Sequence, residues 1–157
     1  MLSTDEAGLQ NAIEESGLIC KKTVGVSMNP FIVQGRDTVI VVKNKDRLKK
    51  YDGALFKRAN GTFALHRVMK ILNDGYIIIG DNCFKGEYVG EKQILGILDG
   101  YYKGENKYVD CNSRAYKFKI RLWYFFPVRY AGMFFLRVGY VFKRFFKKIF
   151  GKKKKQS

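Results

Sequence analysis

The sequence predicts a mainly β fold, with a short helix at the N-terminus and a basic amphipathic helix at the C-terminus. The first observation is that short runs rich in Val, Ile, Phe and Tyr, separated by turn dipeptides, fill most of residues 17–98. The second is composition, because 46% of the 157 residues are hydrophobic and only 2 are prolines, which suits about one folded domain. The third is a helical spacing of aromatic and basic residues after residue 126.

The elements can be taken in chain order. A short helix is expected to begin at Ser3 or Thr4, whose side chains can cap its first turn, and to end near Gly17. The acidic residues that follow the cap favour this helix, because negative charge stabilises a helix N-terminus. Hairpin turns are expected at Asn60-Gly61 and at residues 73–75. The expected strands cover residues 37–42, 54–58, 62–72, 76–79 and 94–102.

The formal net charge of +16 is unevenly distributed. Fourteen of the 30 lysines and arginines lie at or after Arg114, and no acidic residue follows Asp110. The rest of the chain is nearly neutral, with 16 basic against 14 acidic residues. We therefore expect a β domain over residues 1–112 and a basic aromatic tail over residues 113–157, where a negatively charged partner would bind.

The N-terminus is acidic and polar, so it has neither the basic and apolar regions of a secretory signal nor a membrane-spanning segment. We expect a cytoplasmic protein with reduced thiols. If the tail binds a membrane, the protein would be peripheral on its inner face.

A serine and a histidine stand out as a candidate catalytic pair. Ser27 lies in a Gly-Val-Ser-Met-Asn-Pro turn, and His66 is the only histidine of the chain. Histidine can take and return a proton near neutral pH because its unperturbed pKa is roughly 6.5, so such a pair is the minimum for acyl transfer. His66 falls in the expected strand 62–72, whose alternation places it on the same face as Ala64 and Val68. The alternative is that Ser27 is an ordinary turn residue and His66 a packed one.

Several short motifs around these two residues follow one another in a fixed order. They are Ser27-Met28-Asn29-Pro30, Tyr51-Asp52-Gly53-Ala54-Leu55-Phe56, Leu65-His66-Arg67-Val68 and Gly80-Asp81-Asn82. They resemble the Ser-Met-x-Pro box, the Gly-Asp-x-Val-x-Phe strand, the His-Arg-Val segment and the Gly-Asp-Asn box of type I signal peptidases and the related self-cleaving repressor peptidases. Histidine in the third motif is similar to the endoplasmic-reticulum and archaeal branch, since bacterial members use lysine. The resemblance covers roughly residues 20–100 and implies a coiled β-sheet or partial barrel.

The resemblance implies a role for each matching position. Ser27 is expected to be the nucleophile, with its backbone N–H as an oxyanion donor, and His66 the base that takes its proton. Asp81 would hold the imidazole or the active-site loop. Glu87 stands near the family's second acidic position, with Glu in place of Asp, and Gly25 stands where bacterial relatives carry a hydroxyl. The supporting residues of the nucleophile box are Met28 and Pro30. Arg67 is expected to pair with a carboxylate.

The expected activity is that of a serine endopeptidase, which cleaves a leader, signal or precursor peptide bound in extended form, after a small residue. One alternative is a catalytically inactive peptide-binding module, and another is a self-cleaving regulator, which needs a scissile loop in the same chain. No cofactor or metal is expected, because Cys20, Cys83 and Cys111 are widely spaced and form no C-x-x-C pair.

The tail supplies the second expected binding surface. Pro127 fits the first turn of a helix that runs to about Phe150, with Gly151 as its stop. Basic side chains of this helix fall within an arc of about 140°, and aromatic ones fill the opposite side, as in helices that lie in a membrane surface. Residues 127–155 are therefore expected to bind an anionic membrane surface. The alternatives are packing against the β domain or a partner protein, and nucleic acid, which fits less well because the aromatics are segregated from the cations.

Overall fold

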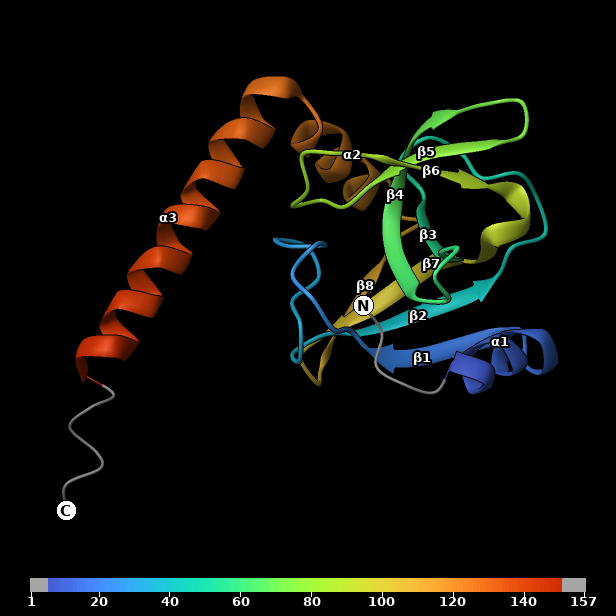
Figure 1. Ribbon diagram of the computed structural model, residues 1–157, viewed down its shortest axis with the longest axis horizontal. Helices are drawn as coiled ribbons and strands as arrows, with labels where there is room; N and C mark the ends of the chain where they lie inside the picture. Colours follow the sequence, from blue (N-terminus) through green and yellow to red (C-terminus); the bar gives the residue numbers. More distant parts are fainter. Residues whose placement is uncertain (1–5, 151–157) are drawn as a thin grey trace, which may run out of the picture. The chain divides into compact units, whose positions relative to one another are not determined.

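A computed structural model describes residues 6–150 of the chain. The chain divides into two compact units, residues 1–119 and 120–157, which we consider separately. The first unit is mainly β, as predicted, and its eight strands form one antiparallel sheet that does not close into a barrel (Figure 1). The predicted helix caps Ser3 and Thr4 and the terminal lysines 152–155 lie outside the described residues.

The N-terminal helix and five of the strands follow the prediction closely. The helix ends two residues before Gly17, whose φ of +70° is the left-handed conformation that glycine favours after a helix. The prediction did not name three short strands, β1, β6 and β8. In chain order the elements are α1 (Glu6–Glu15), β1 (Leu18–Lys22), β2 (Thr38–Lys43), β3 (Gly53–Lys57), β4 (Phe63–Ile71), β5 (Gly75–Ile79), β6 (Glu87–Gly90), the short 3-10 helix η1 (Glu91–Gln93), β7 (Ile94–Lys103) and β8 (Lys107–Asp110).

The strand order explains why β4 has one incomplete edge. The strands are arranged β1-β2-β7-β3-β4-β5-β6, and β8 pairs with β7. Strand β4 pairs with β3 from Phe63 to Arg67, whereas β5 pairs with it only from Arg67 to Ile71. The half of β4 from Phe63 to His66 therefore has one edge along which no described strand runs. Such an edge can accept another extended chain.

One cluster of the hydrophobic core lies on the face of the sheet that His66 shares. Ala64 and Val68 are both buried in this core, and the ring of His66 lies 5.8 Å from that of Phe56, centroid to centroid. Alternation along β4 thus directs the histidine to this face, as predicted. The buried members of the core cluster are Leu48, Ala54, Phe56, Ala64, Val68, Tyr76, Ile78 and Val89.

The C-terminal helices are α2 (Arg114–Trp123), which the sequence analysis did not predict, and α3 (Phe126–Phe150), which begins one residue before the predicted start. Gly132 of α3 lies directly on the ring of Trp123, since a Cβ at this position would come within 2.4 Å of it. The guanidinium of Arg129 is buried and lies 4.4 Å from the ring centre of Tyr124. None of the described helices is both long enough and apolar enough to cross a membrane.

Candidate active site

Ser27 lies in a loop that hydrogen bonds fix to the turn after β5. The backbone N–H of Asn82 donates to the carbonyl of Ser27 at 2.7 Å, and the Asn82 side chain donates to the carbonyl of Val26 at 3.3 Å. Gly25, with a φ of +96°, donates its N–H to Gln34 Oε1 at 3.0 Å, and the Asn29-Pro30 bond is cis. The loop is therefore held at both sides of the serine.

Gly80 allows the serine loop to pack closely beside the end of β5. The β4–β5 ladder ends where Arg67 pairs with Ile79, so Gly80 is the first residue beyond it. A Cβ on Gly80 would lie 3.1 Å from Ser27 Cβ and 2.8 Å from the Ser27 carbonyl oxygen. Ser27 therefore packs directly on Gly80. Leu65, which lines a small hollow together with Ser27, points to the face of β4 opposite to His66.

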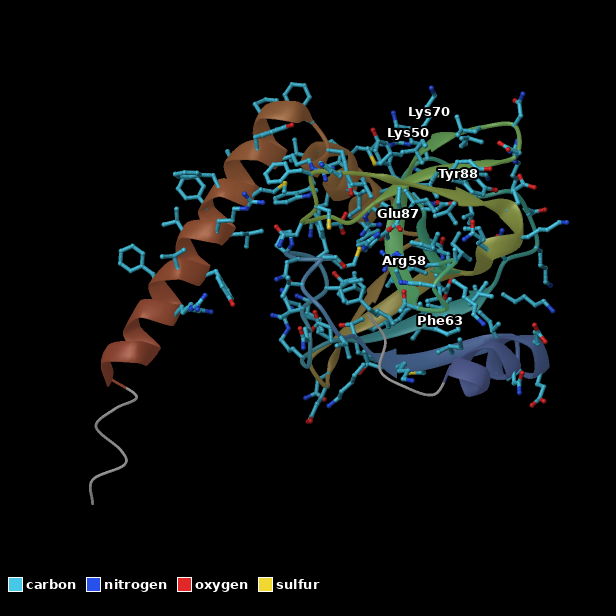
Figure 2. The ribbon with its side chains drawn as sticks, viewed as in Figure 1. Lys50, Arg58, Phe63, Lys70, Glu87 and Tyr88 are labelled. Atoms are coloured by element: carbon cyan, nitrogen blue, oxygen red, sulfur yellow. The ribbon has the colours of Figure 1, made fainter. Side chains whose placement is uncertain are left out.

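His66 is hydrogen-bonded to Glu87. Its Nδ1 lies 3.1 Å from Glu87 Oε1, and only 7% of the residue is exposed. Glu87 also receives two hydrogen bonds from Arg58, both at 2.7 Å (Figure 2). A carboxylate at Nδ1 favours the tautomer that leaves the Nε2 lone pair available as a base. Nε2 makes no hydrogen bond with any described residue, so it is available for this task.

Burial is the main reason why His66 is neutral near pH 7. Burial lowers the pKa of the His66 imidazole below its usual 6.5, and it outweighs the nearby Glu87 carboxylate, which acts in the opposite direction. Arg58 lowers the pKa of His66 further, while the Arg58 hydrogen bonds lower the pKa of Glu87 below 4.5. A neutral imidazole beside an ionised carboxylate is the resting state that a general base requires.

Asp81 has a different partner from the one that the resemblance offered first. Its carboxylate receives Arg67 Nε at 2.8 Å and Arg67 Nη2 at 3.0 Å, and both side chains are almost completely buried. Arg67 Nη2 also donates to the hydroxyl of Tyr116 at 2.7 Å. Arg67 thus pairs with a carboxylate, as expected. Of the two roles expected of Asp81, the contact with the imidazole is made by Glu87 instead, and the role of holding the active-site loop remains a prediction.

Ser27 and His66 do not contact each other through a hydrogen bond in the described part of the chain. Hydrogen bonds between catalytic groups are often long without substrate and tighten when it binds. The geometry is thus compatible with the predicted pair, although the serine proton has no direct path to the imidazole in this state.

A small hollow adjoins the serine. Its volume is about 20 Å³, roughly the room that one water molecule needs. Met28, Ile32 and Leu65 form its apolar walls, and Leu65 belongs to the half of β4 that lacks a strand partner along one edge. Pro30 is exposed and does not line the hollow. The complete lining is Thr23, Val24, Gly25, Ser27, Met28, Ile32 and Leu65.

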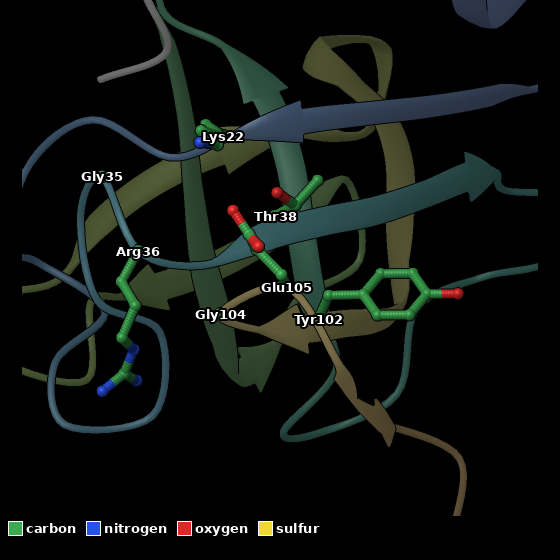
Figure 3. A pocket seen from close by; sticks show the side chains of 7 residues that line it. All are labelled: Lys22, Gly35, Arg36, Thr38, Tyr102, Gly104 and Glu105. Atoms are coloured by element: carbon green, nitrogen blue, oxygen red, sulfur yellow. The ribbon is translucent and has the colours of Figure 1, made fainter.

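Two of the larger hollows differ in their relation to these residues, and a third, of about 450 Å³, is lined by Pro30. One of about 410 Å³ adjoins the ion pair between Arg58 and Glu87. The other, of about 480 Å³, is lined by the ends of β1, β2 and β7, where Lys22, Arg36 and Glu105 carry mixed charges (Figure 3). None of the predicted site residues lines the second hollow, so it is not part of the candidate active site.

Two residues near the predicted site were missed by the sequence analysis. Arg58 was named only as the end of a strand, and Cys83 only as one of three unpaired cysteines. Cys83 Sγ would lie 2.8 Å from a Cβ on Gly80, next to Ser27, and its charge can act on the pKa of Arg58. The sequence signal for Cys83 was its place directly after the Gly-Asp-Asn motif. Arg58 offered no signal, because its partner lies 29 residues away.

No protein-family description, curated protein or solved structure matches the chain. Among the described residues, no group of three or more His, Cys, Asp or Glu side chains could hold a metal ion.

Proposed function

We propose that the β unit is a signal-peptidase-like serine endopeptidase in which Ser27 is the nucleophile, His66 the general base and Glu87 the carboxylate that orients the imidazole. The observation that carries this proposal is the environment of His66. The ring is buried and neutral, Nδ1 is bonded to Glu87, and Nε2 makes no hydrogen bond with the described residues.

The proposed mechanism follows from these positions. As Ser27 Oγ attacks the peptide carbonyl, its proton moves to His66 Nε2, and the imidazolium that forms is stabilised by Glu87. The backbone N–H of Ser27 makes no hydrogen bond with the described residues, so it can donate to the oxyanion. The imidazolium then protonates the leaving amine, and water releases the acyl group from the serine by the same steps in reverse.

The proposed substrate is an extended peptide segment. It would add to the free edge of β4 between Phe63 and His66, where its backbone can form the hydrogen bonds that β5 does not supply. Leu65 on this edge also lines the hollow beside Ser27. Because this hollow holds only about 20 Å³, it favours a small side chain next to the scissile bond.

Peptide hydrolysis tests the proposal directly. We expect the purified protein to cleave a leader-like peptide with a small residue before the scissile bond, and Ser27→Ala to abolish turnover while circular dichroism shows an unchanged fold. A fluorophosphonate probe should modify Ser27 alone, and Ser113→Ala, which alters a helix-capping serine, is the matched control. Turnover that persists in Ser27→Ala would reject the proposal.

A peptide-binding module without catalysis is the second candidate, and the missing hydrogen bond between Ser27 and His66 favours it. This module would use the same free edge of β4. It predicts that wild type and Ser27→Ala bind the peptide equally well by fluorescence anisotropy and that neither cleaves it.

We further propose that the second unit binds an anionic membrane surface, such as the cytoplasmic leaflet, through α3. Five apolar side chains fall on one side of this helix at 100° per residue and are exposed by 39% to 71%. Arg137, Lys143 and Arg144 are exposed on the opposite side, where they can approach lipid phosphates. Arg129, in contrast, is buried over Tyr124 and is withdrawn from this surface. The apolar residues are Phe134, Phe135, Val138, Val141 and Phe142.

Vesicle sedimentation tests the membrane proposal. We expect binding to vesicles that contain phosphatidylglycerol, weaker binding to phosphatidylcholine alone, and loss of binding when residues 127–157 are deleted. Changing Phe134, Phe135 and Phe142 together to serine should abolish binding. Changing Arg137, Lys143 and Arg144 to glutamine should weaken binding to phosphatidylglycerol vesicles and reduce its salt dependence. Unchanged sedimentation of the deletion variant, or tighter binding to a DNA oligonucleotide than to vesicles, would overturn it.

A further inference from the structure

Arg58 forms the most extensive contacts with the candidate catalytic carboxylate. Its Nε donates to Glu87 Oε2 and its Nη2 to Glu87 Oε1, both at 2.7 Å, which is the two-pronged geometry that fits a carboxylate best. The guanidinium also lies 5.5 Å from the ring centre of Phe56. Backbone hydrogen bonds from Arg58 to Thr62 and from Gly61 to Arg58 close the hairpin that carries it. The residue that makes this two-pronged contact is therefore held in place by the β3–β4 turn.

Arg58 and His66 share one oxygen atom of Glu87. Oε1 receives Arg58 Nη2 at 2.7 Å and lies 3.1 Å from His66 Nδ1, so this single oxygen atom links the guanidinium to the imidazole. With Oε2 occupied by Arg58 Nε, the carboxylate cannot rotate without breaking a hydrogen bond to Arg58. The plane that Arg58 imposes on the carboxylate consequently sets the direction in which Glu87 meets His66.

We propose that Arg58 is a positioning residue for the candidate active site, which fixes the Glu87 carboxylate toward His66 and offsets part of its negative charge. This inference rests on the proposed function, because it assigns a role within the same site. Arg58 touches neither the scissile bond nor the nucleophile in this scheme, and it acts through Glu87.

The charges that act on His66 come from three parts of the chain. Glu87 at the start of β6 and Asp81 after β5 raise the pKa of His66, while Arg58 lowers it, and burial lowers it most. Without Arg58, the full charge of Glu87 would act on the imidazole. The pKa of His66 would then rise, and the carboxylate would be free to turn away from Nδ1.

Two substitutions separate the effect of the positive charge of Arg58 from its effect on the orientation of the Glu87 carboxylate. Arg58→Met removes both, whereas Arg58→Lys keeps a positive charge but cannot form the two-pronged contact, because an ammonium is a point donor. We expect the pKa of His66 to rise in Arg58→Met and to stay close to wild type in Arg58→Lys. Both variants should lose about tenfold or more in kcat with little change in KM, since a displaced base slows the chemical step.

Because His66 is the only histidine, its imidazole signals in NMR spectra need no assignment. The experiment measures the pKa of His66 and its tautomer from ¹³C and ¹⁵N shifts in the Ser27→Ala background, alone and combined with Arg58→Met or Arg58→Lys. The matched control is Arg47→Met, which removes a guanidinium from an exposed pair with Glu91. The pH profile of kcat/KM is recorded for the same Arg58 variants with Ser27 intact.

The inference is supported if Arg58→Met raises the pKa of His66, if both Arg58 variants mix the two tautomers, and if Arg47→Met changes neither. It is overturned if the pKa and the tautomer stay at their wild-type values in both folded Arg58 variants. Should Arg58→Met fail to fold, Arg58→Lys still decides through the tautomer. Absence of peptide hydrolysis in wild type rejects the proposed function alone, since the NMR titration does not require turnover.

Discussion

Gly80→Ala, which adds a single methyl group, should disturb the geometry of the candidate site while the protein remains folded. The Cβ of an alanine here would lie 2.8 Å from the Ser27 carbonyl oxygen, 2.8 Å from Cys83 Sγ and 3.1 Å from Ser27 Cβ. The Cys83 side chain can rotate, but the Ser27 carbonyl is backbone and cannot. To restore an ordinary separation of about 3.5 Å, the Ser27 loop must move by about 0.7 Å.

The cost of this movement differs for stability and for activity. Overpacking by one methyl group typically costs about 1–3 kcal/mol, and the Asn82 hydrogen bond to the Ser27 carbonyl would be strained or lost. A misplacement of about 1 Å at a reacting group can cost about 10²-fold in rate. We therefore expect Gly80→Ala to lower kcat/KM by about 10-fold to 10²-fold while the protein remains folded.

Peptide hydrolysis and urea denaturation measure the two effects side by side. Gly90→Ala is the matched control, because a Cβ there would meet its nearest neighbour at an ordinary 3.5 Å and the φ of −70° suits alanine. If Gly80→Ala were as active as Gly90→Ala, activity would not depend on how the Ser27 loop packs on Gly80, and the proposed role of Ser27 would lose support.

The remaining predictions concern the buried charges and the thiol near the site. Asp81→Asn should lower the free energy of unfolding by about 3–5 kcal/mol in urea denaturation, because it leaves Arg67 as a buried charge without its counter-ion. Because the pKa of His66 is lowered in the folded protein, His66 contributes stability above its unfolded pKa of roughly 6.5, and this stability is lost as pH falls through the folded pKa. His66→Gln should therefore flatten the decline in unfolding free energy between about pH 7 and pH 5. A bulky maleimide on Cys83 should block peptide hydrolysis, because this thiol lies beside Ser27 over Gly80.

The predictions for Asp81 and Cys83 are each paired with a change at an exposed residue. Glu91→Gln removes the partner of Arg47 in an exposed ion pair and should change stability little. Equal losses for Asp81→Asn and Glu91→Gln would contradict the importance of the buried pair. The maleimide experiment is done with Cys20→Ser, since Cys20 is exposed and Cys111 is buried. Inactivation that persists after Cys83→Ser, or a stability profile that His66→Gln leaves unchanged, would refute the respective prediction.

The central strands could be predicted because local sequence and tertiary environment agree there. Residues 62–72 alternate small or apolar side chains on the core face, and the Asn60-Gly61 turn fixes where β4 begins. Strands β1, β6 and β8 contain only four or five residues, several of them charged, and the β-propensity of so short a run is weak. Their extended conformation comes from pairing with β2, β5 and β7, which the sequence does not specify locally.

Helix α2 was missed even though it carried a start signal. The Ser113 hydroxyl accepts the backbone N–H of Tyr116 at 3.3 Å, which is the pattern of an N-terminal cap. The helix that follows is rich in aromatic and basic residues and has no acidic residue in its first turn, so the usual charge pattern of a helix start is absent. Its buried face depends on Tyr116, whose hydroxyl is bonded to Arg67 of β4.

The division of roles between the two acidic residues could not be read from the sequence. Asp81 and Glu87 lie six residues apart, and both follow β5. Which one meets His66 depends on the register of β5 with β4 and of β6 with β5, and a shift of one residue would turn each side chain to the opposite face. Arg58 became visible only when the β3–β4 hairpin placed it beside Glu87.

Alternation along β4 places the Arg67–Asp81 ion pair and the His66–Glu87 hydrogen bond on opposite faces of the strand. His66 and Arg67 are neighbours in sequence, yet the first meets Glu87 on the core face and the second meets Asp81 on the other. The buried Arg67–Asp81 pair ties β4 to the turn after β5, and this turn contains Gly80 and Asn82, which contact Ser27. The ion pair thereby helps to fix the position of the serine loop. A loss of activity in a variant of Asp81 would therefore be explained by displacement of the serine loop, with the His66–Glu87 hydrogen bond still in place.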